Sequence, residues 1–373
     1  MHAHIIYFNY LNPDGNGMSI GGIQTYIANL IPVLNECGYQ VTVYQRSNLD
    51  FHKQLPNCDV FGIGHPRNHC PEVAKAILKK ALSQIEIDKD LLIYGCETCI
   101  TSSVPCRTIA IQHGILWDVP SSEHYSSIQY FKHYIGKCRA AWKIIQRVSK
   151  VDSLVCVDNN FINWHKAVTP YPKINHIVIP NFTEVPSEQP AKSNDMIHII
   201  FARRFFIHRG TRLFGNVVVR LLNDYQNVKI TIAGTGPDAD YLHQQLDAFP
   251  QVCFTTFSSQ DSLSIHKGMD IAVIPTIGSE GTSLSLLEAM ASGCAPICTN
   301  VGGMTNIVLD GYNGLMITPN EEALYQALST LINDAELRSK LQKNAYQTAK
   351  DAFSMTIWKK KWTKLIKQIT PNS

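Results

Sequence analysis

The sequence predicts an α/β protein made of two doubly wound domains. At 373 residues the chain exceeds the usual size of a single hydrophobic core, so we expect two domains. Short apolar runs typical of strands alternate with helical patterns along nearly the whole chain, which favours parallel sheets covered by helices on both faces. The stretch 181–195 is polar, holds three prolines and has no strand pattern, so it is predicted to be a linker.

The first predicted domain covers residues 1–180. Its clearest strands are short apolar runs, at His4–Phe8, Val41–Tyr44, Leu91–Gly95, Thr108–His113 and Ser153–Val157. The helix expected after the first strand carries apolar residues at positions i, i+3, i+4, i+7, i+8 and i+11, namely Ile23, Tyr26, Ile27, Leu30, Ile31 and Leu34. This spacing places them on one face of a helix, which is therefore expected to pack against the sheet.

The second predicted domain covers residues 196–352 and repeats the pattern. Its strands are predicted at Ile197–Ala202, Lys229–Gly234, Val252–Phe257, Ile271–Pro275 and Ala295–Cys298. A helix is expected at Ser283–Ser292, with Gly293 as its stop. In such sheets ligands bind at the carboxyl ends of the strands, so the loops that follow these strands are the first place to look for a site.

Composition limits the function classes. With 45% hydrophobic and 17% charged residues, the chain is typical of a soluble globular protein, and no apolar run approaches the ~20 residues of a membrane-spanning helix. The start resembles a first strand rather than a signal peptide, and eleven scattered cysteines suit reduced thiols, so we expect a cytoplasmic protein. Cys96 and Cys99 have no partner pair at zinc spacing, so no metal site is predicted.

Two glutamates, Glu280 and Glu288, frame the most informative loop. Glu280 follows the apolar run Ile271–Pro275, and Glu288 lies more than one turn into the helix after it. Between them, the backbone around Gly281, Thr282 and Ser283 presents free N–H groups at a helix N-terminus, which suits a phosphate. One carboxylate can bind hydroxyls on one side of a diphosphate, and the second can bind hydroxyls on the other side. A nucleotide sugar has this arrangement, with a sugar on one side of its diphosphate and a ribose on the other.

The segment from Pro275 to Pro319 resembles the E-x7-E signature of retaining GT-B glycosyltransferases, especially glycosyltransferase family 4. The resemblance rests on Glu280 and on the matches that follow it, at Glu288–Ala291, Gly293, Gly302–Gly303 and Asn313–Leu315. It implies two Rossmann-like domains facing a central cleft. It also implies that a C-terminal helix within residues 353–373 crosses back to the first domain.

Two further motifs resemble the phosphate-binding parts of this family. Gly21 and Gly22 open the first helix, where glycines let the backbone approach a diphosphate closely, although a plain tight turn would also need them. The stretch 201–210 resembles the family pattern of an arginine followed five residues later by a lysine, which assigns Arg204 and Arg209 to the donor phosphates. Arginine replaces the usual lysine at 209, and Arg203 receives no role.

Two more positions match the family less specifically. Gly234 and Gly236 resemble its G-x-G-P turn near the nucleotide base, but a turn that merely needs positive φ explains them almost as well. His113 ends a first-domain strand, where the family often has a histidine that contacts the donor sugar. A structural role is the alternative for this histidine.

The resemblance implies a retaining transferase that moves a hexose-type sugar from a nucleoside-diphosphate sugar, with UDP favoured, to a glycan or lipid-linked glycan, as in surface polysaccharide synthesis. Glu280 would hold the sugar, and Glu288 the ribose. No D-x-D pair follows a strand, so we expect no metal cofactor. A GT-B-like nucleotide-sugar epimerase and a non-catalytic nucleotide-sugar-binding subunit remain alternatives. Nothing points to nucleic acid.

The region 121–150 is aromatic and basic, and it has no acidic residue from His124 onward. One interpretation is a helix at an anionic membrane surface beside a lipid-linked acceptor, which would make the protein peripheral. The alternative is a solvated helix whose Tyr130, Tyr134 and Trp142 pack inward.

Overall fold

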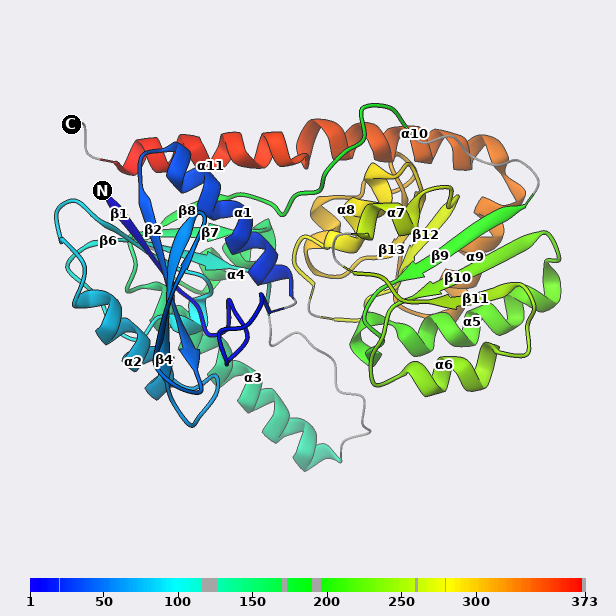
Figure 1. Cartoon of the computed structure of the whole chain (residues 1–373). Helices are drawn as coiled ribbons and strands as arrows, with labels where there is room; N and C mark the ends of the chain where they lie inside the picture. Colours follow the sequence, from blue (N-terminus) through cyan, green and yellow to red (C-terminus); the bar gives the residue numbers. More distant parts are fainter. Residues whose placement is uncertain are drawn as a thin grey trace. The chain divides into compact units, whose positions relative to one another are not determined.

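The computed structural model describes residues 1–19, 21–115, 126–169, 173–189, 196–258, 261–278 and 280–370. They form two compact units, shown in Figure 1. Unit 1 comprises Met1–His113, Ser127–Pro180 and the last helix from Trp358, and unit 2 comprises Gly114–Ser126 and Asn181–Ile357. Each unit is an α/β domain with a mainly parallel sheet, which confirms the predicted fold class.

Unit 1 has an eight-stranded sheet in the order β3-β4-β2-β1-β5-β6-β7-β8. The strands are β1 (His2–Ile6), β2 (Gln40–Ser47), β3 (Phe51–Leu55), β4 (Cys58–Gly64), β5 (Leu91–Tyr94), β6 (Arg107–Gln112), β7 (Ser153–Cys156) and β8 (Asn175–Val178). All neighbours pair in parallel except β3, which runs antiparallel to β4 at one edge. All five strands predicted for this half are present, whereas β3, β4 and β8 were not predicted.

The helices of unit 1 are α1 (Gly22–Glu36), α2 (Pro71–Leu82), η1 (Glu97–Cys99), α3 (Ser127–Val148), α4 (Asn159–Val168) and most of α11 (Met355–Ile369). Helix α11 joins this unit through buried aromatic contacts with α1. The Trp362 indole N–H donates to the Tyr26 hydroxyl at 2.9 Å, and the Trp358 ring meets the Tyr26 ring edge-on at 5.1 Å. Buried tryptophans contribute large apolar areas, so these contacts attach the last helix to unit 1.

Helix α3 does not have its aromatic side chains packed inward, which was the alternative considered from the sequence. Tyr130, Tyr134 and Trp142 are all exposed, so they do not pack into unit 1. Only Ile144 and Val148, near the end of the helix, are buried. The region considered from the sequence begins earlier, and its residues 121–125, including His124, lie outside the described residues.

Unit 2 has a six-stranded, fully parallel sheet in the order β11-β10-β9-β12-β13-β14. The strands are β9 (Ile197–Ala202), β10 (Val228–Ala233), β11 (Val252–Thr255), β12 (Ile271–Ile274), β13 (Ala295–Thr299) and β14 (Leu315–Ile317). The five predicted strands appear within a residue or two, and β14 was not predicted. The order reverses between β9 and β12, and in doubly wound sheets ligands bind at such a switch point.

Helices cover both faces of the unit 2 sheet. They are η2 (Ile207–Arg209), α5 (Thr211–Asp224), α6 (Ala239–Leu246), α7 (Ser262–His266), α8 (Leu284–Ala291), η3 (Gly302–Asn306), α9 (Glu321–Asn333) and α10 (Ala335–Ala352). Ile199 belongs to one buried cluster and Ile200 to another, as expected where successive strand residues face opposite sides. Both faces of β9 are therefore buried.

The stretch 181–195 was expected to be a linker. Its described part, 181–189, contains only an isolated bridge from Thr183 to Ser354, and residues 190–195 lie outside the described residues. Thr183 is buried, and its N–H donates to the Phe353 carbonyl at 2.9 Å. The first residues of this stretch are thus held within unit 2.

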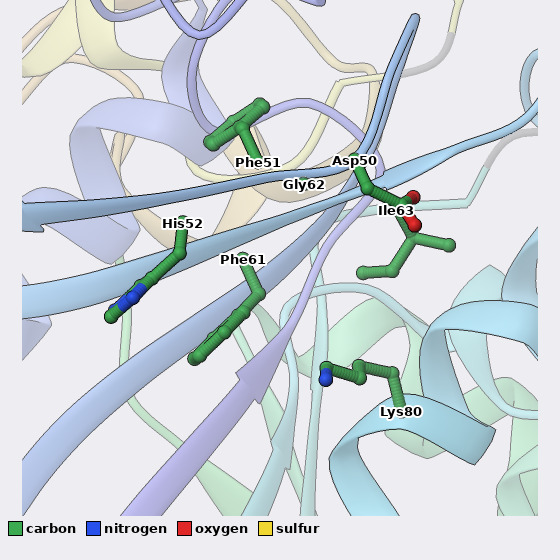
Figure 2. A pocket seen from close by; sticks show the side chains of 7 residues that line it. All are labelled: Asp50, Phe51, His52, Phe61, Gly62, Ile63 and Lys80. Carbon is green, nitrogen blue, oxygen red and sulfur yellow. The ribbon is translucent and has the colours of Figure 1, made fainter.

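A hollow of about 410 Å³ lies on the β3–β4 side of unit 1 (Figure 2). Its lining residues come from the β3–β4 hairpin and α2: Asp50, Phe51, His52, Phe61, Gly62, Ile63 and Lys80. The His52 and Phe61 rings stack with centroids 4.2 Å apart, and Lys80 lies over the Phe61 ring. None of the site residues predicted from the sequence lines this hollow.

Among the helices that the structure describes, none combines the length and the apolar character needed to cross a membrane.

Candidate active site

The predicted loop lies at the carboxyl end of β12, beside the switch point of the unit 2 sheet. The chain leaves β12 after Ile274, passes through Glu280 and enters α8 at Leu284. Ser283 is the N-cap residue of α8, and its buried hydroxyl has no hydrogen-bond partner within the described chain. A helix start with free N–H groups and an unpaired hydroxyl favours an anionic ligand.

Glu280 is held by two arginines. Arg203 donates to its Oε2 at 2.6 Å, and Arg209 donates to the same oxygen. The Thr276 hydroxyl adds a third contact to Oε2 at 3.1 Å, and Arg203 also donates to Thr276. Within the described part of the chain all these donors reach Oε2, so Oε1 is left for a ligand hydroxyl.

This cluster keeps Glu280 ionised. Burial alone would raise the pKa of the Glu280 carboxyl, but the charges and hydrogen bonds of Arg203 and Arg209 hold that pKa below its ordinary value. Two guanidinium groups and one carboxylate leave a net charge of about +1 in a partly desolvated place. The Arg209 side chain is 30% exposed, against 4% for Arg203, so Arg209 is the cation that a ligand can reach.

The pairing adds Arg203 to the residues predicted from the sequence, and the assignment of Arg204 and Arg209 to the donor phosphates stays a prediction. Arg203, which had received no role, joins Arg209 at Glu280, whereas Arg204 is exposed. The physical reason is strand alternation. The Arg203 N–H still bonds to the Ala233 carbonyl, so the chain continues its extended course past β9, and successive side chains face opposite ways.

The glycines around this loop allow close backbone packing. Gly303 donates its N–H to the Glu280 carbonyl at 2.9 Å, and a Cβ added at Gly303 would collide with the backbone of Gly281. Gly234 and Gly236 have φ values of 144° and 157°, and side chains there would strike the backbone of Arg203 and Phe205. Close packing against the loop that carries Arg203 thus requires glycine at both positions, and their place near the nucleotide base stays a prediction.

Glu288 lies on α8 and is partly buried. Desolvation raises the pKa of its carboxyl to about 7, although a hydrogen bond with the Ser262 side chain acts in the opposite direction. A carboxyl with this pKa changes its charge near neutral pH, and ligand hydroxyl groups that donate to it would favour the ionised form.

Of the two unit 1 motifs, His113 has local partners, whereas the glycine pair lies at the start of a helix. His113 follows β6, its Nε2 lies 3.0 Å from the Gly95 carbonyl oxygen, and its ring meets the Tyr26 ring edge-on at 5.2 Å. Burial lowers the pKa of His113 to about 4, so the imidazole is neutral at pH 7. Gly21 is the N-cap of α1 with an extended backbone, and Gly22 is the first helical residue, so both lie at the start of this helix. Their part in binding a diphosphate stays a prediction.

The geometry agrees with comparisons to known proteins. Residues 183–348 match the family model described as glycosyl transferases group 1. An uncharacterized glycosyltransferase of Methanocaldococcus jannaschii is 29% identical over 165 residues, which cover 43% of this chain and 41% of that relative. Residues 183–348 are therefore similar to glycosyl transferases group 1, and the match to the relative spans less than half of that relative's length.

Solved structures share the fold over the whole chain. A sucrose-phosphate synthase from Thermosynechococcus elongatus superposes with a TM-score of 0.78, 13% identity and 99% coverage of both chains. Anabaena HepE in complex with UDP-glucose gives a TM-score of 0.71 at 14% identity, covering 99% of this chain and 100% of that chain. The fold is thus that of GT-B glycosyltransferases.

Proposed function

We propose that the protein is a retaining glycosyltransferase. It would move a hexose-type sugar from a nucleoside-diphosphate sugar, with a UDP-sugar favoured, to a glycan or lipid-linked glycan acceptor, as in surface polysaccharide synthesis. The observation that carries the proposal is the cluster of Arg203, Arg209 and Glu280 next to the N-terminus of α8, inside the region similar to glycosyl transferases group 1.

The cluster suits a diphosphate leaving group. Cleavage of the bond between the anomeric carbon and the diphosphate develops negative charge on the phosphate oxygens. We expect this charge to form beside the accessible Arg209, the N-terminus of α8 and the Ser283 hydroxyl, which would stabilise it. Arg203 is more buried and acts through Glu280, so we assign it a positioning role. These groups would neutralise the charge of the diphosphate, and we propose no metal cofactor.

The two glutamates take opposite sides of the diphosphate. Glu280 stays ionised and has Oε1 free within the described chain, so it would accept hydrogen bonds from sugar hydroxyls and orient the ring. Glu288 lies just over one turn into α8 and would accept hydrogen bonds from the ribose hydroxyls. The roles of Arg204, His113, Gly21 and Gly22 follow from the family resemblance alone and remain part of the proposal.

The chemistry follows the same resemblance. The acceptor oxygen would form its bond to the anomeric carbon on the face that the diphosphate leaves, and the departing phosphate oxygen would take the acceptor proton. The anomeric configuration is then retained. UDP is the favoured carrier because Anabaena HepE, which shares the fold, was solved with UDP-glucose.

The test is a turnover assay with the full chain, a panel of nucleotide sugars and alkyl glycosides as acceptors. We expect nucleoside diphosphate to be released only when donor and acceptor are both present. Proton NMR of the product should show the anomeric configuration of the donor. Inversion would contradict the retaining mechanism, and conversion of the donor without acceptor would favour an epimerase. Donor binding without turnover across the panel would favour a non-catalytic subunit.

The location of the protein is also a proposal. We infer that it works in the cytoplasm, as a peripheral protein at the membrane where a lipid-linked acceptor would lie.

A further inference from the structure

Helix α3 of unit 1 exposes large apolar side chains along most of its length. The exposed fractions are 70% for Ile128, 65% for Tyr130, 63% for Phe131, 55% for Tyr134 and 59% for Trp142. In Figure 1 the first turns of α3 extend away from the sheet of unit 1. Scattered exposed apolar residues need no explanation, but a group of five on one helix indicates an interaction surface.

These residues follow a helical stripe. Ile128, Phe131, Cys138 and Trp142 are exposed and lie at positions i, i+3, i+10 and i+14, and the half-buried Ile135 fills position i+7. Ile144 is buried, and it lies roughly 160° around the axis from Ile128 at 100° per residue. Helix α3 therefore packs on unit 1 through one face and leaves its more extensive apolar face uncovered.

The stripe is bordered by positive charge. Lys132, Arg139 and Lys143 lie within roughly 60° of Ile128 around the axis, so they flank the stripe on one side. Lys137 and Arg147 add charge elsewhere on the helix, and Ser127–Val148 contains no acidic residue. The surface is thus apolar, aromatic and cationic, and its complement is an apolar surface with anionic groups.

A second copy of the chain is a poorer complement. The 3-4 spacing of the stripe would suit a helix pair, but two α3 helices would bring their flanking cations together with no carboxylate to offset them. Aromatic residues and cations on one helix are typical of helices that lie in the interface of a bilayer, where rings sit at headgroup level.

We propose that α3 docks the protein on an anionic lipid surface, lying along it with Phe131 and Trp142 among the headgroups and with Lys132, Arg139 and Lys143 against lipid phosphates. This lipid-binding surface lies on unit 1 and goes beyond the proposed function. Lipid binding there does not require the nucleotide-sugar donor. Its failure can therefore be told apart from failure of the transferase proposal.

The charge part is tested by flotation of the full chain with vesicles of phosphatidylglycerol and phosphatidylcholine at low salt. Each cation near such a surface strengthens partitioning about fivefold, so K132Q/R139Q/K143Q should bind about 100-fold more weakly. The matched control is K360Q/K364Q/K367Q, which removes the same charge from exposed positions on α11 and should float like wild type.

Insertion is tested by fluorescence. Vesicles with brominated acyl chains should quench Trp142, so wild type should lose emission and W142F should lose much less. An F131S variant should weaken flotation even at high salt, where screening removes most of the charge contribution. Calorimetric titration of UDP should give the same affinity for all these variants, since α3 lies outside unit 2.

Several results would overturn the proposal. Wild type that does not float with anionic vesicles contradicts it, and so do equal losses for the α3 and α11 variants. Equal quenching of wild type and W142F would exclude insertion of this helix. A dimer in sedimentation velocity that F131S dissociates, together with no vesicle binding, would assign the stripe to a second copy of the chain.

Discussion

Replacing Glu288 with glutamine should stabilise the ligand-free protein at alkaline pH and leave it nearly unchanged in mild acid. Desolvation raises the pKa of this carboxyl to about 7, from 4.5 in the unfolded chain. A group whose pKa is raised on folding contributes stability below its unfolded pKa and loses that contribution as pH rises through the folded value. Wild type should therefore lose stability between about pH 4.5 and pH 7, while the Glu288→Gln variant, which cannot ionise, should not.

The size of the effect follows from the same shift. A difference of about 2.5 units, from 4.5 to about 7, corresponds to about 3 kcal/mol at most. For a domain of 150–250 residues, each kcal/mol moves Tm by about 2–4 °C. The variant should thus melt about 6–12 °C above wild type at pH 8 and close to wild type at pH 5.

The assay is differential scanning calorimetry of the full chain, with both proteins scanned in the same buffers. The second readout is the affinity of UDP across this pH range. The terminal phosphate of UDP also titrates near pH 6. This contribution is the same for both proteins, so it cancels when the wild type is compared with the variant. Wild-type affinity should rise with pH more steeply than that of the variant, because the ribose hydroxyl groups donate to the ionised carboxylate.

The reasoning is refuted if the difference in Tm between variant and wild type is the same at pH 5 and pH 8. It is also refuted if the variant is less stable at both, since Glu288 would then not carry an unfavourable charge. If UDP binding depended equally on pH in the two proteins, Glu288 would not bind the ribose. The argument about stability would be unaffected.

Three further outcomes are expected. Arg209→Ala should lower kcat more than it raises the donor KM, since its charge matters most in the transition state, and Arg209→Lys should recover part of the rate; a lysine variant no better than alanine would show that the planar guanidinium is required. Arg203→Met removes one partner of a buried pair, which costs about 3 kcal/mol, so calorimetry should show a lower Tm, and an unchanged Tm would contradict the positioning role. Gly303→Ala should lower both Tm and UDP affinity by displacing the Glu280 loop, whereas Gly136→Ala, which has open space around it on α3, should lower neither; equal behaviour of the two would dismiss the packing argument.

The sequence predicted most of the fold because parallel strands buried on both faces are continuous apolar runs. Three of the four missed strands, β3, β8 and β14, lack that signal. The hairpin strand β3, FHKQL, is polar and mostly exposed, and β8 and β14 are edge strands of only three or four residues. Apolar patterns cannot identify such edge strands, because the side chains of these strands are not packed in a core and need not be apolar.

The candidate site was predicted in part. The strand, loop and helix that carry Glu280 and Glu288 were located correctly, because the helix pattern and the strand before it are both clear. Arg203 was missed because both faces of β9 are buried, so the apolar run has no alternation to show which of two adjacent arginines turns toward Glu280. The pKa of Glu288 depends on burial within unit 2, which no local pattern encodes.

The exposure of α3 could not be predicted either. Its apolar stripe has the same period as that of a core helix, and only the structure shows that the opposite face packs.

The most direct test of the central claim is calorimetric titration of nucleoside diphosphates into the full chain, with inorganic diphosphate as the reference ligand. We predict one binding site per chain for a nucleoside diphosphate, with UDP favoured. Glu288→Ala should weaken that binding about 10- to 100-fold, by the loss of a charge-assisted hydrogen bond, and should leave diphosphate binding unchanged. The account would be contradicted if no nucleoside diphosphate bound, or if Glu288→Ala bound it as tightly as wild type.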